Sequence, residues 1–260
     1  MEKHENKRII YGYVAEPIKI NEDYVFGSVL SPTPKTILQP NGDWTEFLPT
    51  DEYQNLNRIE TQACTSFGTL NCVEILIKRV MGQQFNYSDR WSAWNSGTTA
   101  TGGNTPQRVA ETLRKTGVPF QGKWDFTPDI DTPEKFYQNP PVKLFDDAKK
   151  DFSFSFSHEY VPSSKEMMLQ ALKLSPLGIA VSAWNVENGI YISAGMPNNH
   201  WVCCYGFDKE KDAFKVFDSY DGSRKLYKGD ISVVKRYSVD KVVDCNTRLW
   251  FSKIKNFLWR

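Results

Sequence analysis

The clearest pattern of hydrophobic and polar positions is helical and lies in residues 65–81. Its apolar side chains recur at three- and four-residue spacing, at Phe67, Leu70, Val73, Leu76 and Val80. This spacing predicts a helix with a buried face, which Gly82 ends. A second helix is predicted from Thr105 to Lys115, because the proline after Thr105 favours the first turn and Gly117 supplies a stop signal.

The patterns after residue 150 are mostly those of strands. Phenylalanines alternating with polar residues predict a half-buried strand over Phe152–Val161. The capping box Ser163-x-x-Glu166 predicts a short helix over Lys165–Leu174. A continuous apolar run then predicts a strand over Ile179–Trp184.

A β-hairpin is the last clear unit. Trp201–Phe207 and Ala213–Phe217 are both apolar and β-prone, and a charged loop joins them. Residues 86–104 and 118–150 show no regular period and are predicted to be irregular. A helical half is thus followed by a β-rich half, which predicts an α+β fold with a cleft between the halves.

Composition excludes several classes of protein. The 260 residues include 32 Lys and Arg against 31 Asp and Glu, a net charge of +1, and 40% of them are hydrophobic. This balance excludes a disordered chain and gives no basis for a nucleic-acid or membrane partner. No apolar run approaches about 18 residues, and the start MEKHENKRII lacks the apolar stretch of a signal peptide. We expect a cytoplasmic or virion-associated protein.

Cysteines direct attention to one helix end. There are five, without Cys-x-x-Cys spacing, so free thiols are expected and a structural zinc site is not. Cys64 lies where the first predicted helix begins. The free amides and the positive dipole end there favour a thiolate and can hold an oxyanion, and Gln62 can add a side-chain donor. A buried structural thiol is the alternative.

The hairpin brings a histidine and an acid together. Pairing its strands with Phe207 opposite Ala213 puts Asp218 within about one diagonal of His200. A carboxylate beside an imidazole fixes its tautomer and stabilises the imidazolium. With Cys64, these residues form the set expected for an activated nucleophile. We see no convincing metal site and no phosphate-binding glycine loop, so no cofactor is expected.

These residues resemble the papain-like cysteine peptidases of the papain and cathepsin type. The segment Gln62-Ala63-Cys64-Thr65-Ser66-Phe67-Gly68 is similar to the family's Gln…Cys-Trp-Ala-Phe-Ser segment. Other similar segments, in the family's order, are Thr101-Gly102-Gly103-Asn104, Ser175-Pro176-Leu177-Gly178, Asn199-His200-Trp201-Val202, Tyr205-Gly206-Phe207 and Phe217-Asp218-Ser219-Tyr220. The match runs from about Trp44 to about Gly222.

The resemblance implies a two-lobed fold, with a helical N-terminal lobe, a β-rich C-terminal lobe and the active site between them. It implies a peptidase that acts on a polypeptide substrate through an acyl-enzyme. Cys64 would be the nucleophile, His200 the general base and acid, and Asp218 the group that orients His200. Gln62 would serve the oxyanion hole. The substrate-binding residues that it implies are Gly102, Gly103, Asn199 and Tyr220.

We divide the chain on this basis into three parts. Residues 1–43 form an N-terminal extension, residues 44–230 the papain-like catalytic domain, and residues 231–260 a C-terminal extension that packs on the same domain. Strand-like pieces in the two extensions are Ile9–Val14, Tyr24–Leu30, Val233–Val234 and Val242–Val243.

The sequence departs from the family at four positions. Gln62 lies two residues before the cysteine, whereas the family's oxyanion glutamine lies further upstream. Thr65 replaces a tryptophan, and Asp218 replaces an asparagine. Thr101 stands where the substrate loop has a cysteine, so the family's disulfide framework is missing. This agrees with a reducing, bacterial or phage setting, where a phage protein would have an assembly partner.

Other functions remain open. Asp218 also suits a transglutaminase-like enzyme or a peptidoglycan-peptide amidase with the same Cys-His-Asp order. The missing tryptophan and displaced Gln62 suit a catalytically silent domain used for binding or assembly. The sequence Gln62-Ala63-Cys64 also matches the caspases, but their histidine lies upstream, where only His4 is found.

Other candidate residues have simpler explanations. His158 is an alternative to His200, but it is expected on a solvated strand face with only Glu159 beside it. Cys72, Cys203 and Cys204 are expected to pack in the core.

Overall fold

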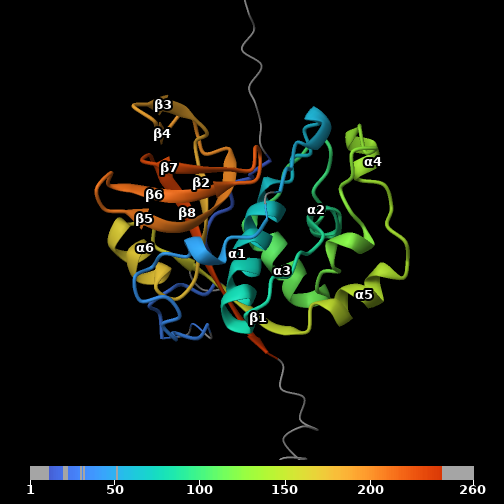
Figure 1. Cartoon of the computed structure of the whole chain (residues 1–260), viewed down its shortest axis with the longest axis horizontal. Coiled ribbons are helices and arrows are strands. Elements are labelled where there is room, and N and C mark those ends of the chain that lie inside the picture. Colours follow the sequence, from blue (N-terminus) through green and yellow to red (C-terminus); the bar gives the residue numbers. More distant parts are fainter. Residues whose placement is uncertain (1–11, 20–22, 30, 32, 51, 242–260) are drawn as a thin grey trace, which may run out of the picture.

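Helices gather in one lobe of the molecule and strands in the other (Figure 1). The computed structural model describes residues 12–19, 23–29, 31, 33–50 and 52–241. The helices are α1 (Cys64–Met81), α2 (Asp89–Ser96), α3 (Pro106–Thr116), α4 (Pro133–Phe136), α5 (Leu144–Asp151) and α6 (Lys165–Leu172). Single-turn 3-10 helices lie at Thr45–Phe47, Leu56–Arg58 and Gln121–Lys123. Helices α1 to α5 belong to the helical side and α6 packs on the sheet, so the predicted two-lobed α+β fold is confirmed.

The strands form one mixed sheet. They are β1 (Phe154–Val161), β2 (Leu177–Val181), β3 (Asn185–Glu187), β4 (Ile190–Ile192), β5 (His200–Asp208), β6 (Ala213–Asp218), β7 (Ser223–Tyr227) and β8 (Ile231–Lys241). Their order in the sheet is β1-β8-β2-β5-β6-β7-β4-β3. β5 lies in the middle, antiparallel to both β2 and β6, so its side chains are buried along most of its length.

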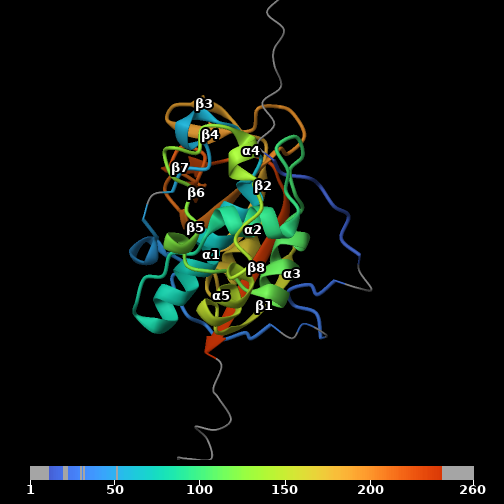
Figure 2. The same cartoon turned by 90° about the vertical axis from the view of Figure 1, so that its right-hand side faces the viewer.

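Helix α1 runs between the sheet and the other helices (Figures 1 and 2). Its residues from Cys64 to Ile77 are buried on every side, because it packs against both lobes. Gly68 permits its close approach to β5: a Cβ at this position would lie 2.9 Å from Cδ1 of Trp201 and 3.0 Å from the Trp201 carbonyl oxygen. This contact sets the first turn of α1 against the strand that begins at His200.

Strand β8 is an interior strand of the sheet. It pairs antiparallel with β1 on one side and with β2 on the other. Residues 231–241, which the sequence analysis assigned to a C-terminal extension, therefore complete the core of the β lobe. The strand predicted at Val242–Val243 lies outside the described residues.

Two stretches predicted to be irregular contain helices. α2 lies within residues 86–104, α4 lies within residues 118–150, and α5 begins there and ends at Asp151. The hydroxyl of Ser88 caps α2 by accepting the N–H of Trp91, but the buried residues of α2 mix polar with aromatic side chains and show no apolar period. α4 and α5 have four and eight residues, which is too short for a period to be recognised.

The two segments before residue 43 that were predicted to be strand-like make isolated β-bridges in their described parts. Within Tyr24–Val29 the chain makes one bridge, from Val25 to Tyr160, and Leu30 is not described. Of Ile9–Val14 only the last three residues are described, with one parallel bridge from Tyr13 to Asn104. Both segments use their backbone groups to attach to the body of the protein rather than to each other.

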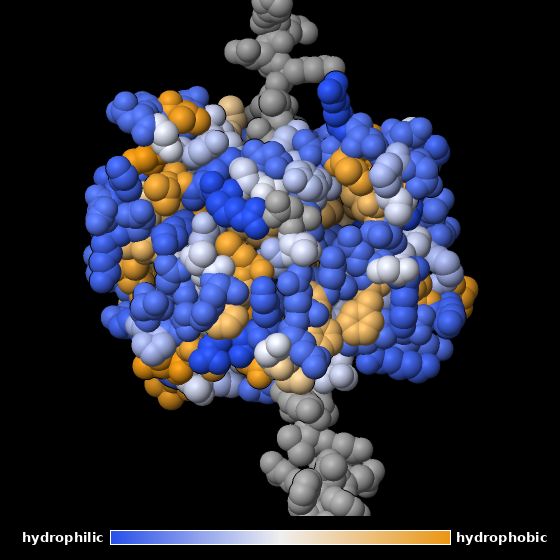
Figure 3. Space-filling view, in the orientation of Figure 1, coloured by the Kyte–Doolittle hydropathy of each residue, from blue (hydrophilic) through white to orange (hydrophobic). Residues whose placement is uncertain are grey.

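The face shown in Figure 3 is mostly hydrophilic, with hydrophobic side chains in small separate patches. Within the described part of the chain, no helix has the length and apolar character needed to cross a membrane.

Candidate active site

Cys64 is the first residue of α1 and has no exposed surface. Its side chain belongs to a small apolar cluster with Tyr13, Ala180 and Trp201. The backbone N–H groups of Trp201 and Thr65 both donate hydrogen bonds to its sulfur, which favours the thiolate and lowers the pKa of the thiol. The sulfur therefore lies between the start of α1 and the beginning of β5.

Burial has the largest effect on this thiol. It raises the pKa of Cys64 well above its ordinary value, and the negative charges of Glu60 and Asp218 act in the same direction. The amides at the start of the helix oppose this shift without overcoming it. In this closed arrangement the thiol is thus held in its neutral form, whereas the sequence alone led us to expect a stabilised thiolate.

His200 and Asp218 meet across the hairpin. Nε2 of His200 lies 2.7 Å from Oδ1 of Asp218, and both side chains are at most 1% exposed. The backbone N–H of Tyr220 donates to the same oxygen at 3.0 Å. Burial opposes ionisation of Asp218, but the charges of His200 and Lys225 hold its pKa well below its ordinary value. Asp218 is therefore a carboxylate that fixes the orientation of the imidazole.

The predicted register is correct where it matters for this pair. Cys203 pairs with Phe217, as the proposed alignment requires, so continuing the ladder toward the strand ends brings His200 and Asp218 together. An irregularity between Cys204 and Gly206 shifts the pairing by one residue toward the turn, where Phe207 faces Phe214.

Aromatic rings and one acid enclose the imidazole. The ring of Trp184 lies 5.8 Å from that of His200, and the ring of Tyr220 lies 6.3 Å away, both edge to face. Tyr220 also makes a hydrogen bond to Glu60, whose carboxyl is close enough to His200 to feel its charge. Nothing in the sequence pattern indicated Glu60 or Trp184.

Two glutamines lie upstream of Cys64. Gln62 is 8% exposed, has a left-handed backbone (φ 57°), and donates its N–H to Oε1 of Glu60 at 3.0 Å. Gln54 is fully buried and is held against Ser219: its N–H donates to the Ser219 carbonyl at 2.9 Å, and its Oε1 accepts the Ser219 hydroxyl at 3.3 Å. Nε2 of Gln54 is a buried donor with no hydrogen-bond partner. Sequence reasoning missed Gln54 because ten residues separate it from Cys64.

Gly102 and Gly103 form the predicted glycine loop. Gly102 closes a tight turn with Thr99 through two backbone hydrogen bonds of 3.0 and 3.3 Å. Gly103 lies against another segment of backbone, since a Cβ added there would be 1.8 Å from the carbonyl oxygen of Gly12. Only glycine permits so close an approach.

Residues 12–14 run between the two lobes; we call them the N-terminal strap. On the helical side, Asn104 donates its N–H to the Gly12 carbonyl at 2.8 Å and accepts the N–H of Val14 at 2.9 Å. On the β side, the N–H of Tyr13 donates to the carbonyl of Asn199 at 3.4 Å. The strap thus occupies the backbone groups of the loop that the resemblance assigns to substrate.

The strap also covers the thiol. The Tyr13 ring stacks on that of Trp201, with centroids 5.9 Å apart and planes 9° apart, and it packs in the cluster of Cys64. Gly12 lies on Gln62, where a Cβ would be 2.0 Å from the carbonyl oxygen. This arrangement contributes to the complete burial of Cys64.

His158 does not lie on a solvated face, so that expectation was wrong. It is 7% exposed, and its Nε2 lies 2.9 Å from Oε1 of Glu111 on α3, an acid partner that its own strand pattern could not indicate. Its Nδ1 lies 3.2 Å from Nζ of Lys235. Burial and the Lys235 charge lower its pKa to about 4.

The other described thiols are structural, and Cys245 lies outside the described residues. Cys72, Cys203 and Cys204 are free, fully buried and part of the main core. Among the described residues, no group of three or more metal-binding side chains is suited to hold a metal ion.

Solved structures that are similar to this chain include cysteine proteases. No family model and no curated protein sequence matches the chain. Xylellain, a cysteine protease from Xylella fastidiosa, superposes with a TM-score of 0.66 over 90% of this chain and 96% of its own, at 17% identity. Digestive procathepsin L 3 of Tenebrio molitor gives 0.57 over 84% and 74%, at 13% identity.

A third solved structure gives the same result. The bromelain protease from Ananas comosus, in complex with the E64 inhibitor, superposes with a TM-score of 0.58 over 76% of this chain and 98% of its own, at 16% identity. The chain therefore has the fold of the papain-like cysteine proteases.

Proposed function

We propose that the protein is a cysteine peptidase that hydrolyses peptide bonds in a polypeptide substrate. One observation carries the proposal: a cysteine opens the central helix beside the strand on which a buried imidazole is held by a carboxylate. The fold of the cysteine proteases supports it.

The chemistry divides between three side chains. Since Nε2 of His200 is engaged by Asp218, Nδ1 is the ring nitrogen that accepts the thiol proton of Cys64. The thiolate then attacks the carbonyl carbon, and the amine leaves with the proton from His200, which forms a thioester. Water, deprotonated by His200, attacks the thioester, and Cys64 leaves as the thiol.

Cys64→Ala is expected to reduce hydrolysis of an unfolded protein substrate at least about a thousandfold, because no other nucleophile replaces the sulfur. Cys72→Ala is the matched control, since this thiol is buried on the same helix away from the start. Labelling by an epoxide inhibitor, followed by mass spectrometry, measures the same site. Activity that survives in Cys64→Ala would contradict the assignment.

Gln54 is our candidate for the side-chain donor to the oxyanion. Its unpartnered buried Nε2 and the clamp from Ser219, next to Asp218, support this role. Gln54→Ala is expected to lower kcat about 10²–10³-fold, the usual effect of removing such a donor. Gln62→Ala, made in parallel, tests the residue indicated by the sequence. A larger loss with Gln62→Ala than with Gln54→Ala would assign the role to Gln62.

A catalytically silent binding domain is the second candidate, and the complete burial of Cys64 favours it. It predicts that Cys64 stays unreactive even when the strap is displaced. The aspartate on His200 also suits a transglutaminase-like enzyme or a peptidoglycan-peptide amidase. Assays with amine acceptors and cell-wall peptides, run beside the protein substrate, separate these acyl-transfer reactions.

A further inference from the structure

Asp218 has a second ionic partner on the side away from His200. Nζ of Lys225, on β7, donates to Oδ2 of Asp218. The same ammonium lies 2.9 and 2.8 Å from the two carboxylate oxygens of Asp221. The Lys225 side chain is 2% exposed, whereas that of Asp221 is 49% exposed. Asp218 thus divides its two oxygens between an imidazole and a buried lysine.

The hairpin of β6 and β7 produces this arrangement. Asp218 ends β6 and pairs with Ser223, the first residue of β7, so Lys225 lies two residues along the adjacent strand. The ammonium lies 5.3 Å from the ring centres of both Trp184 and Tyr191. Trp184 also packs edge to face on His200. One tryptophan therefore contacts both partners of Asp218.

The charges around His200 explain why such a partner is needed. Glu60 and Asp218 are both acidic, and both act to keep the neighbouring Cys64 protonated. A buried carboxylate next to imidazole without compensation would hold a proton on the ring and oppose its transfer to the leaving amine. The charged and titratable groups that face His200 and Asp218 are Cys64, Glu60, Tyr220, Asp221 and Lys225. Lys225 is the cation among them.

We propose that Lys225 is a positioning residue of this site: its ammonium neutralises Asp218, so that the carboxylate orients His200 as a neutral amide would. The inference rests on the proposed function and adds a residue to it. Asp218 and Lys225 act as one unit, in which the lysine allows an aspartate to stand where the papain-like family has an asparagine.

The unit makes a specific prediction about pH dependence. In Lys225→Met the uncompensated carboxylate stabilises the imidazolium, so the alkaline limit of Cys64 reactivity moves up by about one pH unit. In Asp218→Asn the lysine remains without its main partner, and the limit moves down. The double variant Asp218→Asn/Lys225→Met removes both charges, so its profile returns toward that of the parent and its rate exceeds that of either single variant.

The experiment measures the rate of Cys64 alkylation by iodoacetamide against pH in the full chain, with the modified residue identified by mass spectrometry. Lys225→Arg, which keeps the charge, is expected to retain the parent profile. Lys215→Met is the control, because Lys215 pairs with Asp43 at 2.7 Å elsewhere on the sheet. Alkylation needs no peptide substrate, so loss of hydrolysis cannot be mistaken for failure of this inference.

Each result of this experiment supports or contradicts either the role of Lys225 or the proposed peptidase function. Lys225→Met leaves a buried carboxylate unpaired and can fail to fold, but the double variant buries no charge and keeps the test available. A double variant whose rate and profile equal those of Asp218→Asn alone overturns the role of Lys225. A parent chain whose Cys64 reactivity shows no dependence on His200, tested with His200→Ala, overturns the proposed function instead.

Discussion

Gly12→Ala should raise the alkylation rate of Cys64 at neutral pH by about 100-fold, because it displaces the N-terminal strap. Gly12 has a φ of 99°, which an L side chain rarely adopts, and its Cβ would lie 2.0 Å from the Gln62 carbonyl oxygen. This strain raises the free energy of the docked strap relative to that of the displaced strap, so the displaced form becomes more populated. Release also exposes Cys64, and with it removes the main cause of the raised thiol pKa.

The rate of iodoacetamide modification, followed by mass spectrometry, measures this effect. Gly122→Ala is the matched control, since a Cβ at this position meets nothing within 4 Å. Tyr13→Ala is a second way to loosen the strap, through loss of the stacking on Trp201, and should act in the same direction. If both variants react as slowly as Gly122→Ala, the strap does not limit access to Cys64.

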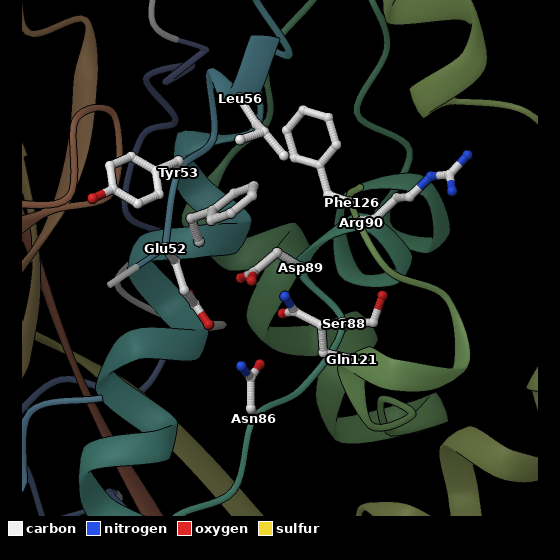
Figure 4. Close-up of a pocket in the computed structure, with 10 residues that line it drawn as sticks. Glu52, Tyr53, Leu56, Asn86, Ser88, Asp89, Arg90, Gln121 and Phe126 are labelled. Carbon is white, nitrogen blue, oxygen red and sulfur yellow. The ribbon is translucent and has the colours of Figure 1, made fainter. Parts of the chain in front are cut away.

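Glu52→Gln should raise the free energy of unfolding relative to the parent, and this gain should be about 3 kcal/mol larger at neutral pH than near pH 4. Glu52 and Asp89 line a cavity of about 120 Å³ (Figure 4), and Glu74 lies close enough for charge repulsion with both. The three residues are 2–5% exposed. In the described structure no lysine, arginine or histidine lies within ion-pair distance of these three carboxyls. Glu52 and Asp89 share a carboxyl–carboxyl hydrogen bond, which requires a proton on one of the two groups.

The sign of the effect follows from the direction of the pKa shifts. Burial raises the pKa of Glu52 from 4.5 to about 8, and burial together with repulsion from Glu52 raises those of Glu74 and Asp89. The folded protein therefore binds protons that the unfolded chain releases. The stability that depends on these protons is fully present below the pKa that the carboxyls have in the unfolded chain. It is lost as the pH rises through about 8, the pKa of Glu52 in the folded protein.

Urea unfolding across this pH range tests the prediction. Glutamine keeps the shape of Glu52 but cannot ionise, so the free energy of unfolding of Glu52→Gln should fall less steeply with pH than that of the parent. Glu210→Gln is the control, since Glu210 is exposed. Parallel curves for the parent and for Glu52→Gln would mean that this carboxyl stays ionised in the fold.

The parts of the candidate site that could be predicted are those set by local pattern. Cys64 was recognisable because an apolar helical period begins there, and α1 does start at this residue. The pairing of His200 with Asp218 followed from the length of one hairpin loop, and the irregularity between Cys204 and Gly206 lies on the turn side of both. Short-range patterns therefore located the residues that one helix and one hairpin carry.

The parts that could not be predicted depend on contacts between distant segments. Gln54 is defined by its contact with Ser219, 165 positions away, and His158 by its contact with Glu111 on another element. The raised pKa of Cys64 depends on the strap and on β5, which no helix pattern includes. Lys225 looks like an ordinary strand lysine until the hairpin turns it toward Asp218.

The interior position of β8 has a consequence for biosynthesis. β1 and β2 are made first, but they do not pair with each other; each pairs with β8, which follows the other described strands in the chain. On the ribosome the sheet therefore stays incomplete until residues up to Lys241 have emerged, and such non-local pairing is slow. Cys64 and the strap are both synthesised long before β2 and β5, so the thiol becomes buried only when the β lobe closes over it at the end of translation.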